Sequence, residues 1–183
     1  MSYDVARVAA LLTITAAAAI CDLATGKLPN RLTYPAVLLG LGLAAGFTGW
    51  PGIVEALAGL AVGFLPMFVA FVVGGYGGGD AKLMAAVGAL ALPDLTLRTL
   101  IYALLIGAAM ALITIIWQGR TRQTMRRFGH ALGLILLGRK PSDPAPPDAP
   151  RVPLGAAIWL GTCWSLLEWR FSTTAWDALA RQF

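Results

Sequence analysis

Charged residues are scarce in this chain. They make up 13% of its 183 residues, whereas a soluble domain of ordinary composition carries about 25%. Hydrophobic residues account for 58%. This composition leaves no room for a large soluble domain, so we expect an all-α, polytopic protein whose main surroundings are a lipid bilayer.

Cysteine and histidine are nearly absent. The two cysteines, Cys21 and Cys163, make no disulfide framework and do not have the spacing of metal ligands. The single histidine, His130, has no cluster of Cys, His or acidic residues around it in the sequence. We therefore expect neither a metal ion nor a cofactor.

Two common signatures are also missing. The glycine-rich run near residue 77 does not end in Gly-Lys-Ser/Thr, which disfavours a phosphate-binding loop. No charged region precedes the first apolar run, so we expect a retained membrane span and not a removed signal peptide. The net charge is +5, but the basic residues gather in a loop between apolar spans. That distribution indicates the cytoplasmic face of a membrane protein and not a nucleic-acid-binding surface.

Apolar segments predict about six transmembrane helices. They cover approximately residues 5–20, 32–47, 53–73, 81–92, 95–117 and 154–167. The fourth segment has only about a dozen residues, fewer than the roughly 20 needed to cross a bilayer. We expect it either to be tilted in a thinned region or to begin inside the membrane, where the glycine-rich loop breaks the helix.

The whole chain, 1–183, is expected to form one membrane-embedded domain. A basic and then proline-rich segment at about 118–153 interrupts it as a cytoplasmic loop. Within the spans, glycine pairs four residues apart indicate close helix packing. These pairs are Gly42 with Gly46 and Gly59 with Gly63.

The basic residues outside the spans predict the orientation. The larger group falls in loops on one face and comprises Lys27, Arg31, Arg120, Arg122, Arg126, Arg127, Arg139, Lys140 and Arg151. The smaller group falls on the other face and comprises Arg7, Arg98, Arg170 and Arg181. This asymmetry places the face with the larger group in the cytoplasm and both termini outside the cytoplasm. Asp22 and Asp80, which end odd-numbered spans, then share the cytoplasmic face.

An acid at the edge of the bilayer is costly and tends to be kept for function. Two carboxylates held close together in a low dielectric share a proton, so one can activate water while the other donates to a carbonyl oxygen. We therefore expect Asp22 and Asp80 to form a catalytic pair for amide hydrolysis. The glycines at 77–79 would let an extended substrate strand approach Asp80 closely. The competing interpretation is that Asp22 is a solvated acid at a helix end.

Three stretches carry a resemblance. Residues 75–83, Gly-Tyr-Gly-Gly-Gly-Asp-Ala-Lys-Leu, resemble the Gly-x-Gly-Asp-x-Lys-Leu signature of the type IV prepilin peptidases, which are membrane aspartic proteases. Residues 21–30, from Cys-Asp-Leu to Lys-Leu-Pro-Asn, resemble their other motif, an Asp followed by an apolar-Pro-Asn triplet. Residues 151–157 are similar to the apolar-Pro-small stretch that opens their last span.

The resemblance implies a catalytic dyad of Asp22 and Asp80, with Gly77, Gly78, Gly79 and Lys82 at the substrate. It implies cleavage of a prepilin leader peptide at the cytoplasmic side of the bacterial inner membrane, with pilus assembly machinery as a further partner. Long members of the family carry an N-terminal cytoplasmic region, often with a Cys-x-x-Cys pair. This sequence has neither, so it looks like the short form of tight-adherence (Flp) pilus systems.

Two other functions remain open from the sequence. One is a related Gly-x-Gly-Asp intramembrane protease that cuts a different substrate. The other is a non-catalytic membrane scaffold of a pilus or secretion system.

Overall fold

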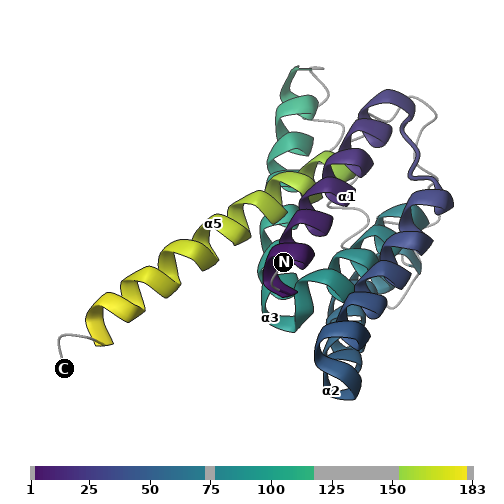
Figure 1. Ribbon diagram of the computed structural model, residues 1–183. Coiled ribbons are helices and arrows are strands. Elements are labelled where there is room, and N and C mark those ends of the chain that lie inside the picture. The colour runs from purple at the N-terminus through teal and green to yellow at the C-terminus, as the bar shows by residue number, and fades with distance from the viewer. Residues whose placement is uncertain (1–2, 73–76, 118–152, 181–183) are drawn as a thin grey trace, which may run out of the picture. The chain divides into compact units, whose positions relative to one another are not determined.

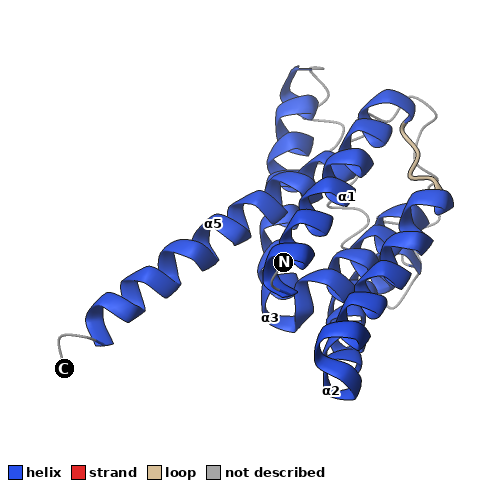
Figure 2. Ribbon diagram, in the orientation of Figure 1, coloured by secondary structure: helices blue, strands red, loops and turns tan. Residues whose placement is uncertain are grey.

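The structure is a computed structural model that describes residues 3–72, 77–117 and 153–180. These residues form four α-helices, which are α1 (Tyr3–Thr25), α2 (Asn30–Val72), α3 (Gly78–Trp117) and α5 (Leu154–Ala180) (Figure 1). No strand occurs among them, and the drawn loop is the connection between α1 and α2 (Figure 2). Helices α1, α2 and α3 are long and apolar enough to cross a membrane. The prediction of an all-α membrane protein is confirmed.

Two of the helices are interrupted. Gly49 inside α2 has φ 66° and ψ −147°, and Leu92 inside α3 has φ 61° and ψ 171°. Gly49 lies between the expected apolar segments 32–47 and 53–73, and Leu92 is the last residue of the expected segment 81–92. Glycine adopts positive φ readily, whereas leucine rarely does. The described residues thus form four helices with two interruptions, and the count of six membrane crossings stays a prediction.

Both halves of α2 pack against the first part of α3. A Cβ atom added to Gly40 would lie 2.8 Å from the carbonyl carbon of Ala89, and one added to Gly59 would overlap the carbonyl oxygen of Gly88. The chain therefore doubles back at Gly49, and backbones approach so closely that only glycine fits.

The first part of α3 is the centre of the bundle. Every residue from Leu83 to Ala91 is buried. The prediction for Gly59 and Gly63 is confirmed, since Gly63 lies against the backbone of Met84. The prediction for Gly42 and Gly46 is wrong, because a Cβ at either would meet nothing within 4 Å. Gly40 makes the contact instead, because it lies on the face of α2 that is turned toward α3.

Helix α5 packs on α1 and α3. Its contacts with α1 are extensive (Figure 1). The buried hydroxyls of Thr99 and Ser165 are hydrogen-bonded at 2.7 Å, and the Tyr102 hydroxyl donates to Oε2 of Glu168 at 2.8 Å. Residues 1–106 and 153–183 form one compact unit. Residues 107–152 form a second unit, of which the structure describes the final turns of α3. The predicted loop at about 118–153 lies almost entirely outside the described residues.

Arg7 binds the C-terminal end of the buried part of α3. Its Nε donates to the carbonyl oxygen of Leu90 at 2.8 Å, and its Nη2 donates to that of Ala91 at 3.1 Å. These carbonyls directly precede the non-helical Leu92, where the helix is interrupted. The side chain also stacks on Tyr3, with 4.9 Å from Cζ to the ring centroid. Arg7 thus has a structural role beyond the orientation signal that the sequence suggests.

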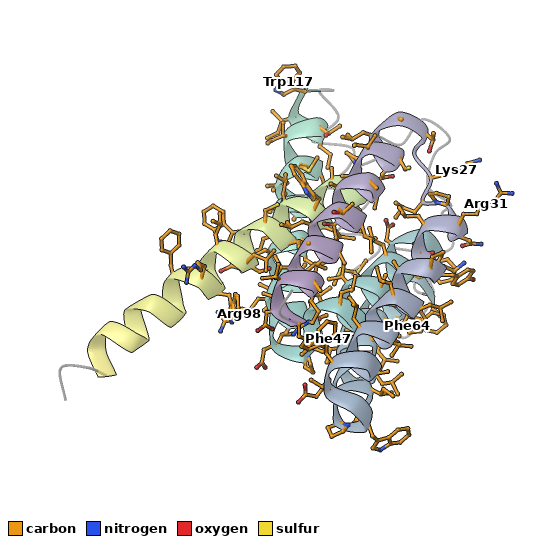
Figure 3. The ribbon with its side chains drawn as sticks, in the orientation of Figure 1. Lys27, Arg31, Phe47, Phe64, Arg98 and Trp117 are labelled. Carbon is orange, nitrogen blue, oxygen red and sulfur yellow. The ribbon has the colours of Figure 1, made fainter. Side chains whose placement is uncertain are left out.

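We expect Arg7→Gln to lower the free energy of unfolding by about 2 kcal/mol, because two hydrogen bonds from a charged donor to backbone carbonyls are weakened. Thermal unfolding in detergent micelles measures the change. Lys27→Gln is the matched control, since Lys27 is exposed in the connection between α1 and α2 (Figure 3). Equal melting temperatures for the two variants would show that Arg7 does not stabilise the end of the buried helix.

Candidate active site

Asp22 lies in the last turn of α1. Gly26, with φ 63°, ends the helix there and donates its N–H to the carbonyl oxygen of Asp22 at 2.7 Å. A glycine in the left-handed conformation is a common helix terminator. The carboxyl group of Asp22 is half-buried, and its Oδ2 accepts the N–H of Gly155 at 2.7 Å. Gly155 belongs to the first turn of α5, so a distant segment fixes this acid.

Asp80 lies in the first turn of α3. Its N–H donates to the carbonyl oxygen of Gly77 at 3.1 Å, and its Oδ2 accepts the N–H of Gly77 at 3.1 Å. An acidic side chain at a helix N-terminus accepts otherwise unpaired N–H groups and interacts favourably with the helix dipole. The carboxyl group of Asp80 is therefore fixed locally by the glycine run that precedes it.

The two carboxyl groups lie at the same end of the bundle. The connection that follows Asp22 packs on the first turn of the helix that carries Asp80, where Leu28 lies against Gly79. In each, Oδ2 accepts a backbone N–H, while Oδ1 makes no hydrogen bond to any other residue that the structure describes. This arrangement leaves one oxygen of each acid for a proton or a water molecule. A pair of this kind suits general acid–base catalysis.

The connection between α1 and α2 packs on the start of α3. A Cβ added to Gly79 would lie 3.1 Å from Cβ of Leu28. Lys82 Nζ donates to Oδ1 of Asn30 at 2.9 Å and lies 5.4 Å from the ring centroid of Tyr34. The Leu-Pro-Asn triplet and the Gly-Asp-x-Lys sequence are thus in direct contact. Their joint presence in the chain has a structural reason, because each segment positions the other beside the acids.

A comparison with protein-family models matches residues 9–112 to the Type IV leader peptidase family. The chain belongs to this family. The match covers more than half of the chain and contains both Asp22 and Asp80. The protein is accordingly an aspartic-type prepilin peptidase, and membership implies that it cleaves leader peptides. Searches among curated proteins and among solved structures gave no match.

The three glycines that the sequence assigns to the substrate of this leader peptidase each face protein atoms. Gly77 lies against Asp80 and Gly79 against Leu28, while a Cβ on Gly78 would be 3.4 Å from the ring of Phe71. The contacts at Gly77 and Gly79 are tight for a side chain, whereas the contact at Gly78 is an ordinary van der Waals distance that would admit one. A role for these glycines in admitting the substrate stays a prediction.

The cations of the peptidase lie at both ends of the bundle. Lys27 and Arg31 are exposed beside the connection that follows Asp22, and Arg98 lies toward the opposite end (Figure 3). Lys82 is at the Asp80 end, whereas Arg7 is at the Leu90 end. The Arg120–Arg151 segment, which contributes most of the predicted cytoplasmic charge, lies outside the described residues. The orientation in the membrane therefore stays a prediction.

Within the described ranges, the peptidase has no group of three or more side chains that could hold a metal ion. Cys21 and Cys163 are free thiols. His130 is not among the described residues.

Sequence reasoning gave no role to Gly155 or Asn30 as individual residues. Gly155 donates to Asp22, and Asn30 accepts from Lys82. Both lie in stretches that carry the family resemblance. The small residues after Pro153 were the available signal, because a helix that begins with small residues can approach another backbone closely.

Proposed function

We propose that this peptidase removes the leader peptide of Flp-type prepilins at the cytoplasmic face of a bacterial inner membrane. Asp22 and Asp80 activate the water that cleaves the bond. The observation that carries the proposal is the symmetry of the two acids, each of which has Oδ2 bound to a backbone N–H. This fixes both carboxyl groups while leaving Oδ1 of each for the reaction.

The reaction begins with one acid ionised and the other protonated. The ionised carboxylate takes a proton from water, and the water oxygen attacks the scissile carbonyl carbon. The protonated acid donates its proton to the carbonyl oxygen, which gives a neutral tetrahedral intermediate. When the C–N bond breaks, the leaving amine takes a proton from the acid that had accepted one. The proton of the new hydroxyl returns to the other acid as the carboxyl product forms.

The substrate would lie as an extended strand along Gly77–Gly79, next to Asp80. Gly77 is exposed, and Gly78 and Gly79 are half-buried. Lys82 borders the same region and is held by Asn30, so it presents a fixed positive charge beside the acids. We assign these four residues to substrate binding.

One feature supports the orientation. Lys27, Arg31 and Lys82 lie at the end of the bundle that holds the acids, as expected for the cytoplasmic side. The choice of Flp-type prepilins as the substrate is tested by the comparison of substrates that follows.

Co-expression with an Flp-type prepilin tests the proposal. We expect a shortened pilin whose new N-terminus, found by N-terminal sequencing and intact mass, lies at the leader junction. A prepilin from another pilus class and an unrelated membrane-spanning leader are the comparison substrates. Cleavage of the unrelated leader alone would favour a different intramembrane protease. No cleavage of any substrate, with pilus assembly still dependent on the protein, would favour a scaffold.

A further inference from the structure

We infer that Gly155 is a positioning residue for Asp22, so that the C-terminal helix completes the active site. The inference rests on the proposed catalytic role of Asp22. Gly155 lies beyond residues 9–112, the part of the chain that the family comparison matches. The segment that follows the unmatched linker therefore supplies a donor to the catalytic acid.

The first argument is the hydrogen bond. The N–H of Gly155 is 2.7 Å from Oδ2 of Asp22, at the short end of the range for an N–H donor. Such a bond to a carboxylate is stronger than one between neutral groups. It restricts rotation of the carboxyl group and leaves Oδ1 as the oxygen that faces the reaction. A backbone donor suits this task because it has no side-chain torsion of its own.

The second argument is the space beside Gly155. A Cβ at this position would lie 2.9 Å from Cβ of Asp22 and 3.0 Å from its Oδ2. Gly155 is buried, so a methyl group could not turn away into open space. Alanine would therefore push Asp22 from its place while leaving the N–H chemically present. Glycine is required here by close approach and not by backbone conformation.

The third argument is that α5 is itself held in position. The pair Thr99 and Ser165 and the pair Tyr102 and Glu168 tie α5 to α3. A Cβ on Gly161 would lie 2.8 Å from the backbone nitrogen of Ala103, so the two helices touch along their backbones. Since α5 is fixed on the part of α3 that follows Leu92, the first turn of α5 holds its N–H donor at a defined place beside Asp22.

The test compares Gly155→Ala with Gly40→Ala in the full-length protein. Both add one methyl group at a tight contact between helices, but only the first contacts Asp22, whereas Gly40 lies against Ala89. We expect Gly155→Ala to lower kcat by about 100-fold with KM unchanged, since a misplaced catalytic group costs about this much. Gly40→Ala should lower the melting temperature and leave kcat of the folded protein unchanged. Equal kcat for the two variants would overturn the inference while the proposed function stands.

A second measurement does not depend on activity. In protein labelled with ¹⁵N-glycine, the Gly155 amide resonance is identified by its loss in Gly155→Ala. We expect its proton to lie at lower field in the native protein than in Asp22→Ala, where the acceptor is gone. An unchanged resonance would overturn the inference. If the native protein cleaves no prepilin, the proposed function fails, and this resonance still decides whether Gly155 positions Asp22.

Discussion

Asp22→Asn and Asp80→Asn are each expected to lower the rate of leader cleavage by about 100- to 10,000-fold, the range that general acid–base groups contribute. Asparagine has nearly the same shape as aspartate, and its carbonyl oxygen can still accept the N–H of Gly155 or Gly77. The substitution thus keeps the packing but removes the titratable carboxyl group, so the side chain can neither take up a proton from water nor carry a negative charge. Cleavage of a co-expressed prepilin, followed by gel shift and N-terminal sequencing, measures the loss.

Asp94→Asn is the matched control for this pair. Asp94 is exposed and follows the interruption at Leu92, at the opposite end of the buried helix from Asp80. The Asp94→Asn variant should cleave the prepilin as the native protein does. All three variants should insert in the membrane to the same extent. Full processing by both Asp22→Asn and Asp80→Asn would rule out the dyad.

The pH dependence follows from the same chemistry. The reaction needs one ionised and one protonated acid, so the rate should fall when the pH is low enough to protonate both. It should also fall when the pH is high enough to ionise both. A bell-shaped profile for the native protein is therefore expected, and a rate that rises without limit toward high pH would contradict a shared proton.

Gly88→Ala should have the largest effect on stability. Gly88 and Gly59 touch through their backbones, and a Cβ on Gly88 would overlap the carbonyl oxygen of Gly59. The two helices must move apart to admit a methyl group. We expect this to lower the free energy of unfolding by about 3 kcal/mol. The melting temperature in detergent micelles should drop, and cleavage should fall with the amount of folded protein.

Gly46→Ala is the control for this substitution. A Cβ on Gly46 would meet nothing within 4 Å, and the residue is exposed. The change should leave the melting temperature nearly as it is or raise it slightly, because alanine favours the helix more than glycine does. Indistinguishable melting of Gly88→Ala and Gly46→Ala would show that the close contact between α2 and α3 is not needed.

The sequence predicted the fold class and the meeting of Asp22 and Asp80 at one end of the bundle. Those predictions succeed because hydropathy and turn residues determine where a membrane chain crosses and reverses. The reversal at Gly49 could be placed because turn residues surround it. The spacing of glycines could not say which helix face packs, so Gly42 and Gly46 were chosen where Gly40 makes the contact.

Individual hydrogen bonds between distant segments could not be predicted from the sequence. The bond from Gly155 to Asp22 joins residues 133 positions apart, and that from Arg7 to Leu90 joins residues 83 apart. Neither uses a residue type that is unusual for its place. Arg7 lies at the carbonyls of Leu90 and Ala91, just before Leu92 interrupts the helix. Pro93 signals that interruption in the sequence, but nothing in the sequence says which side chain meets the carbonyls.

The burial of Leu83–Ala91 explains how a helix can be too short to cross a bilayer and still lie within the membrane protein. Hydrophobic matching to bilayer thickness constrains helices whose sides contact acyl chains. Because other helices surround this one, the lipid sets no minimum for it, and about a dozen residues suffice. The peptidase can therefore hold Asp80 at the start of a short, protein-lined helix, and changes in membrane thickness should act on the outer helices before they reach the acid.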